Sequence, residues 1–135
     1  MTDFRKVTDK LSVSGQIGPD EARAAVAQGF VLVINNRPEG EVPGQPAGAE
    51  VEAAARAAGA DYLHLPVVGR PTLEQAQAQA KAVAGAKGPV LAFCRSGNRS
   101  IMAWAMGEAA AGRDRAELLR LTAAAGYDLS PVLGG

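Results

Sequence analysis

The chain has 135 residues, which suits one domain and is long enough to bury an ordinary apolar core. Its 14 Lys and Arg balance 14 Asp and Glu, so a net charge of zero gives no support for binding to nucleic acid or to an anionic membrane. The single cysteine excludes an internal disulfide framework and is typical of a reducing compartment. Because no signal-peptide core and no membrane-spanning apolar run is present, we expect a cytoplasmic protein.

The first half of the chain predicts two strands and a helix, followed by a long loop. Residues 11–15 alternate and end in glycine, which indicates a short strand at the edge of the sheet, where it can run antiparallel. Pro19 and two carboxylates open a helix that continues to residue 28. Residues 30–34 are continuously apolar and β-branched, as in a strand that is covered on both faces. Residues 35–46 form a polar loop rich in Gly and Pro.

The second half repeats the alternation of helix and strand. Thr72 is a suitable N-cap for the second of its helices. The expected helices cover residues 47–58, 72–86, 98–111 and 114–125, and the expected strands cover residues 61–65 and 89–93. We expect a single domain over residues 1–126 and a loosely ordered tail over residues 127–135.

This order of elements predicts an α/β fold in three layers. A central, mostly parallel sheet of four to five strands is flanked by helices on both faces. Ligands of such folds bind at the carboxyl ends of the strands. Three loops should meet there, at residues 35–41, 66–71 and 94–99.

The strongest chemical signal is the segment Cys94 to Ser100, which lies between a strand and a helix. A thiol at this point faces the backbone N–H groups of a positive helix terminus, which favour the reactive thiolate. Gly97 lets the loop turn tightly, and Arg99 offers a fork of donors for a tetrahedral oxyanion. Ser100 is placed to donate a hydrogen bond to the sulfur. We therefore predict Cys94, Arg99 and Ser100 as catalytic residues.

Other polar residues around this loop are candidates for anion or substrate binding. Arg37 follows a strand and either lines the pocket or forms an ion pair with Glu39 or Glu41. Gln16 either reaches the same rim or stabilises its own turn. Glu39 or Glu41 is a candidate general acid, although loop glutamates are usually solvated. The full set of predicted binding residues is Arg37, Gln16, Arg95, Ser96, Gly97 and Asn98.

The remaining conspicuous side chains favour structural roles. His64 is the only histidine and is expected to be a hydrogen-bonded strand residue, because nothing supplies further ligands for a metal. Met102, Trp104 and Met106 have helical spacing and predict the buried face of the helix after the loop. We expect neither a metal nor an organic cofactor, since no phosphate-binding fingerprint is present.

Four segments together resemble the phosphatase-like domain family of the beta-lactamase hydrolase-like proteins, also described as a sulfurtransferase/phosphatase family. The segments are Val13 to Gln16, Val33 to Glu41, His64 to Val67, and Cys94 to Ser100. The resemblance implies a fold similar to dual-specificity phosphatases, with Cys94 as nucleophile and Arg99 as the anion-binding arginine. In some relatives the domain is fused to, or encoded beside, a persulfide-oxidising enzyme, which implies such a partner here.

Two departures from the tyrosine-phosphatase pattern favour sulfur chemistry. The loop from Cys94 to Arg99 has six residues, similar to single-domain rhodaneses, where the phosphatase pattern has seven, and Phe93 replaces the preceding histidine. Residues 66–71 contain no carboxylate to protonate a leaving oxygen. Our first prediction is a sulfurtransferase that forms a persulfide on Cys94 from thiosulfate or a small persulfide. The alternative is a phosphatase that cleaves phosphate esters through a phosphocysteine, and a third option is an anion-binding or redox-sensing module without turnover.

Overall fold

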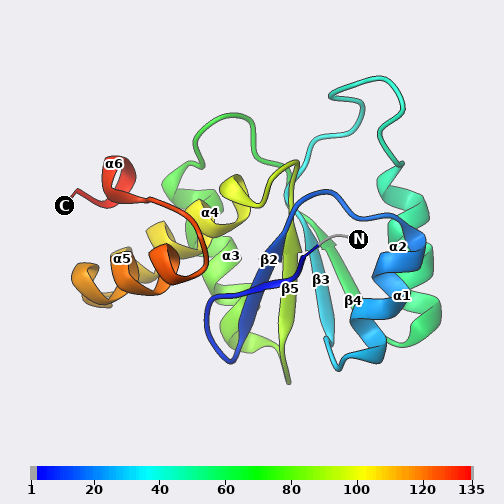
Figure 1. Ribbon diagram of the computed structural model, residues 1–135, viewed down its shortest axis with the longest axis horizontal. Coiled ribbons are helices and arrows are strands. Elements are labelled where there is room, and N and C mark those ends of the chain that lie inside the picture. The colour runs from blue at the N-terminus through cyan, green and yellow to red at the C-terminus, as the bar shows by residue number, and fades with distance from the viewer. Residues whose placement is uncertain (1–2, 135) are drawn as a thin grey trace.

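The computed structural model describes residues 3–134, which form an α/β fold (Figure 1). The strands are β1 (Arg5–Lys6), β2 (Leu11–Ser14), β3 (Leu32–Asn35), β4 (Asp61–His64) and β5 (Val90–Phe93). The helices are α1 (Pro19–Ala27), α2 (Gly48–Ala58), α3 (Leu73–Gly85), α4 (Asn98–Ala110), α5 (Arg115–Ala124) and α6 (Ser130–Leu133). The predicted order of helices and strands is confirmed, with boundaries that differ by one or two residues.

The five strands form one sheet in the order β1-β2-β5-β3-β4. β2, β5, β3 and β4 run parallel, and β1 pairs antiparallel with β2. The expectation that residues 11–15 lie at an antiparallel edge is therefore wrong. The two-residue strand β1 takes the edge instead, and it is too short to produce an alternating pattern that sequence reasoning could detect.

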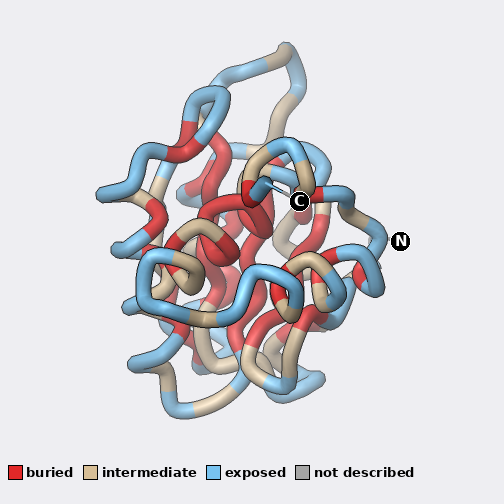
Figure 2. Tube along the Cα trace, turned by 90° about the vertical axis from the view of Figure 1, so that its left-hand side faces the viewer, coloured by how far each residue is buried: buried red, intermediate tan, exposed pale blue. Residues whose placement is uncertain are grey.

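The sheet separates two layers of helices, with α1 and α2 on one face and α3, α4 and α5 on the other (Figure 1). Successive residues of a strand point to opposite faces. In β5, Leu91 and Phe93 pack against α1 and α2, whereas Val90 and Ala92 join the core under α3, α4 and α5. The continuous burial of the central strands is visible in Figure 2. This double burial explains why β5 is apolar at every position.

Local signals in the sequence set the ends of several helices. The Thr72 side chain accepts a hydrogen bond from the Gln75 N–H at 3.1 Å, which confirms the predicted cap of α3. α2 ends at Gly59, whose φ of 109° lies in the left-handed region that favours glycine. α3 and α4 pack closely at Gly107, where an added Cβ would collide with the carbonyl oxygen of Ala76.

The segment after α5 differs from the expected loose tail. Residues 130–133 form the short helix α6, and Leu129 and Leu133 are buried in the same core as α4 and α5. Apolar side chains spaced four residues apart provide this anchorage, although the segment is too short to show a helical period in the sequence. Across residues 3–134, no helix combines the length and the apolar character that crossing a bilayer requires.

Candidate active site

The candidate site lies at the carboxyl ends of the parallel strands. β5 occupies the centre of the sheet, between β2 and β3, and the chain passes from its last residue through Cys94 into α4. The segments that follow β2, β3 and β4 end at the same edge because those strands are parallel to β5. The topology thus brings the predicted loops around one thiol.

Cys94 is fully buried, and its backbone N–H donates to the Ser14 carbonyl at 3.4 Å. The Sγ atom accepts a hydrogen bond from the Gly97 N–H at 3.1 Å. Gly97 has φ of 91°, a left-handed conformation that glycine adopts at little cost and that aims its N–H back at the sulfur. The thiol therefore lies at the N-terminus of α4, as predicted, and receives a backbone donor from that turn.

Arg99 joins two of the three predicted loops. Its Nη1 donates to Glu41 Oε2 and to the Val67 carbonyl, both at 2.8 Å, and its Nη2 donates to Glu41 Oε1 at 2.8 Å. The hydrogen bond to Glu41 raises the pKa of Arg99, partial burial opposes this, and the charge that Cys94 carries when it is ionised raises the pKa further. These bonds use three of the five N–H groups, and the Nε edge of the guanidinium faces away from Glu41. Arg99 is thereby fixed beside the Cys94 sulfur, with which its side chain also interacts.

Glu41 bridges two arginines. Besides Arg99, it accepts a hydrogen bond from Arg37 Nε at 2.8 Å. These hydrogen bonds from Arg99 and Arg37 lower the pKa of Glu41 to about 2. Glu41 is therefore ionised at neutral pH and cannot act as the general acid considered above. Glu39 is also engaged elsewhere, since its Oε1 accepts the Gly48 N–H at 2.9 Å at the start of α2.

Arg37 is buried, with 4% of its surface exposed, and its side chain contacts two other candidates, Gln16 and Glu41. Its Nη1 donates to Gln16 Oε1 at 3.2 Å, and its ion pair with Glu41 is the one the sequence left open. Its Nη2 has no hydrogen-bond partner in the structure. Gln16 also donates from Nε2 to the Ile17 carbonyl at 2.8 Å, so it stabilises its own turn and reaches the rim.

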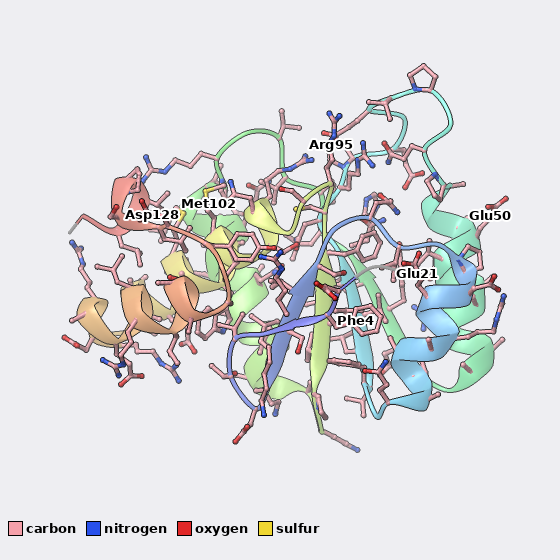
Figure 3. All side chains as sticks on the ribbon, viewed as in Figure 1. Phe4, Glu21, Glu50, Arg95, Met102 and Asp128 are labelled. Carbon is pink, nitrogen blue, oxygen red and sulfur yellow. The ribbon has the colours of Figure 1, made fainter. Side chains whose placement is uncertain are left out.

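The remaining loop residues divide between exposed and buried positions. The side chains of Arg95, Ser96 and Asn98 are exposed, and Arg95 lies at the same end of the molecule as the loop between β3 and α2 (Figure 3). The expected hydrogen bond from Ser100 to the sulfur is absent: Ser100 Oγ is buried without a partner. The sulfur receives the Gly97 N–H instead, which the left-handed turn at Gly97 places nearer to it.

Sequence reasoning missed a buried amide pair beneath the site. Asn36 and Gln79 exchange two hydrogen bonds, of 2.9 and 3.1 Å, and Gln79 also donates to the Ser100 carbonyl at 3.3 Å. The pair ties the end of β3 to α3 and α4. The available signal was two adjacent asparagines at the end of an apolar strand, but the partner of Asn36 on α3 is 43 residues away. His64 contacts the Arg37 carbonyl through Nε2 at 3.0 Å, which agrees with the structural role predicted for it.

Among residues 3–134, no three His, Cys, Asp or Glu side chains gather as they would around a metal ion. Cys94 has no exposed surface. Glu41 occupies one edge of the Arg99 guanidinium as an internal anion.

Comparisons with known proteins agree with the family resemblance of the sequence. The family model of the beta-lactamase hydrolase-like protein, phosphatase-like domain, matches residues 3–111. A beta-lactamase hydrolase-like protein of Agrobacterium fabrum is 39% identical over 127 residues, which are 92% of this chain and 29% of that protein. A Xylella fastidiosa protein of the same name is 40% identical over 125 residues, again 29% of its length. The chain thus spans less than a third of these curated relatives.

Solved structures confirm the expected fold. A phosphatase candidate of Neisseria meningitidis has a TM-score of 0.84 and 29% identity, and the match covers 96% of this chain and 93% of that one. PTPMT1, solved in complex with PI(5)P, has a TM-score of 0.73 at 18% identity, covering 90% and 82%, and shows the fold alone. With the cysteine loop, the protein tyrosine phosphatase-like fold and the family match all in agreement, this chain belongs to the phosphatase-like domain family of the beta-lactamase hydrolase-like proteins.

Proposed function

We propose that this chain is a phosphatase-like hydrolase in which Cys94 attacks the phosphorus of a phosphate monoester. The observation that carries the proposal is the pairing of Cys94 with Arg99. The sulfur accepts the Gly97 N–H at the start of α4, and Arg99 is held beside it by Glu41 and the Val67 carbonyl. A thiolate with a helix terminus and a fixed guanidinium next to it suits attack on a tetrahedral oxyanion.

The proposed reaction has two steps. The Cys94 thiolate forms an S–P bond as the P–O bond to the leaving group breaks, and the leaving oxygen departs with the electron pair. Water then attacks the phosphocysteine, the S–P bond breaks, inorganic phosphate leaves and the thiolate is restored. Arg99 stabilises the equatorial oxygens in both steps, together with backbone N–H groups of the loop other than that of Gly97, which binds the sulfur.

None of the nearby carboxylates is placed and protonated to act as a general acid, which narrows the class of substrate. Glu41 is ionised and paired with two arginines, Glu39 binds the start of α2, and residues 66–71 contribute no carboxylate. A positioned general acid contributes about 10²- to 10⁴-fold, and it matters most for poor leaving groups. We therefore expect aryl or acyl phosphates, whose leaving groups need little protonation, rather than simple alkyl phosphates.

The test compares 4-nitrophenyl phosphate with phenyl phosphate in the wild type and in Cys94→Ser. We expect turnover that Cys94→Ser abolishes and that falls steeply from the nitrophenyl to the phenyl ester. Turnover that survives in Cys94→Ser would come from a contaminant and would refute the proposal. A flat dependence on the leaving group would show that an acid is present and would contradict the substrate class.

Sulfur transfer is the second candidate, and the short loop favours it. With four residues between Cys94 and Arg99, fewer N–H groups surround the sulfur than in the longer phosphatase loop, so the cradle suits a single sulfane sulfur. The Cys94 thiolate would attack the outer sulfur of thiosulfate, form an S–S bond and expel sulfite with the electron pair. An acceptor thiolate would then remove that sulfur and restore Cys94.

Intact mass after incubation with thiosulfate tests this candidate. We expect an increase equal to one sulfur atom, reversed by an added thiol and absent in Cys94→Ser. No mass increase at any thiosulfate concentration, together with turnover of the aryl phosphate, would exclude sulfur transfer from thiosulfate and leave the phosphatase.

A further inference from the structure

The segment that follows α5 contacts the Cys94 loop directly. The Tyr127 hydroxyl donates to the Ser96 carbonyl at 2.9 Å. The same hydroxyl lies so near Gly97 that a Cβ added there would collide with it. The Arg5 guanidinium covers the Tyr127 ring, 5.6 Å from its centroid, which fixes the ring from the other end of the chain. The matched family region ends at residue 111, so Tyr127 lies outside it and Ser96 lies within it.

One peptide unit connects Tyr127 to the thiol. The Ser96 carbonyl and the Gly97 N–H belong to the same trans peptide, so they point in opposite directions. The carbonyl receives the Tyr127 hydroxyl, and the N–H donates to Cys94 Sγ at 3.1 Å. If this peptide turned over, the carbonyl oxygen would face the sulfur and repel a thiolate. Glycine permits such a turn, and the hydrogen bond from Tyr127 opposes it.

The segment that carries Tyr127 is itself anchored on both sides of the site. Leu129 and Leu133 are buried in the core, with 2% and 5% of their surfaces exposed. The Val132 carbonyl accepts a hydrogen bond from Arg70 Nη2 at 3.1 Å. Arg70 belongs to the loop after β4, whose Val67 carbonyl holds Arg99. The segment therefore contacts both the loop of the nucleophile and the loop that orients the arginine.

We propose that Tyr127 is a positioning residue for Cys94, whose hydroxyl fixes the Ser96–Gly97 peptide so that its N–H stays directed at the sulfur. The inference rests on the proposed function only in taking Cys94 as the nucleophile. A hydrogen bond at the carbonyl also polarises the N–H of the same peptide, which strengthens its bond to a negative sulfur. Arg99 and, beyond it, Glu41 are charged groups near the sulfur, and the Tyr127 phenol is a titratable group near it. Burial raises the pKa of Tyr127, Arg5 lowers it, and the charge of an ionised Cys94 raises it further.

The test is Tyr127→Phe, which removes the hydroxyl and retains the ring under Arg5. The far-ultraviolet absorbance of the Cys94 thiolate is followed against pH, with Cys94→Ser subtracted, so the buried sulfur needs no contact with a reagent. We expect the pH of half-maximal thiolate absorbance to rise by about half a unit, a loss of about threefold in thiolate at lower pH. A matching fall in kcat with little change in KM is expected for the aryl phosphate.

Tyr62→Phe is the matched control, since Tyr62 is the other of the two tyrosines in the chain. Its hydroxyl accepts a hydrogen bond from Asn35 Nδ2 at 2.9 Å, away from the cysteine loop. We expect it to leave the thiolate titration unchanged, even where it lowers the free energy of unfolding. An unchanged titration in Tyr127→Phe, or an equal shift in both variants, would overturn the inference. Because the titration uses no substrate, a wild type without turnover would refute the proposed function separately.

Discussion

Glu41→Gln tests the charge network that holds Arg99. The substitution keeps the shape of the side chain and removes its negative charge. Arg37, which is 4% exposed, and Arg99, whose side chain is 15% exposed, then lose the anion between them. Two partly desolvated guanidinium groups without a counter-charge destabilise the folded state, because their desolvation is no longer offset by an ion pair.

The lowered pKa of Glu41 gives the size of the expected loss in the free energy of unfolding. Folding lowers this pKa from 4.5 to about 2, which at about 1.4 kcal/mol per pH unit corresponds to at most about 3 kcal/mol. The Glu41 side chain is 27% exposed, and solvent screening reduces the effect, so we expect Glu41→Gln to lower the free energy of unfolding by about 2 kcal/mol at pH 7. The folded pKa is lowered, so this stabilisation is present above pH 4.5 and declines as the pH falls toward 2.

Urea unfolding followed by the fluorescence of Trp104, the only tryptophan, measures the effect. We expect the difference between wild type and Glu41→Gln to shrink to roughly half by pH 3. Glu52→Gln is the control, since Glu52 also pairs with an arginine four residues away, but with both side chains 41–50% exposed. It should cost less than about 0.5 kcal/mol. Equal costs in the two variants, or a difference that does not change with pH, would refute the reasoning.

Three further substitutions and one control probe the site and its support. Arg99→Lys removes the planar fork, so kcat/KM for the aryl phosphate should fall about 10- to 100-fold while the fold is retained; unchanged kinetics would contradict the assigned geometry. Gly107→Ala should lower the free energy of unfolding by about 1–3 kcal/mol, because its Cβ collides with a carbonyl oxygen of α3. Gly85→Ala, with open space around it, should be neutral or stabilising in the same urea assay. Gln79→Leu leaves the buried Asn36 amide without its partner and should cost about 1–3 kcal/mol; a neutral effect in urea would show that the pair is dispensable.

The sequence alone determined the architecture because its signals are local. Continuous apolar runs indicated strands buried on both faces. Thr72 marked a helix start through its side-chain hydroxyl, and Gly59 marked a helix end through its left-handed backbone. The cysteine between a strand and a helix located the site, since parallel strands bring their carboxyl ends to one edge. The resemblance to the phosphatase-like family rested on the same short segments.

Only the tertiary structure showed which residues far apart in the sequence form hydrogen bonds and ion pairs with one another. Glu41 and Arg99 are 58 residues apart, and Tyr127 and Ser96 are 31 apart, so no local period connects them. Glu41 was an acid candidate from its residue type, and hydrogen bonds from the distant Arg99 and from Arg37 in the same loop make it an ionised anchor. Ser100 was expected to face the sulfur, but the turn at Gly97 gave that position to a backbone N–H. Charge state and hydrogen bonding depend on what the fold brings within about 3 Å, which a linear pattern does not encode.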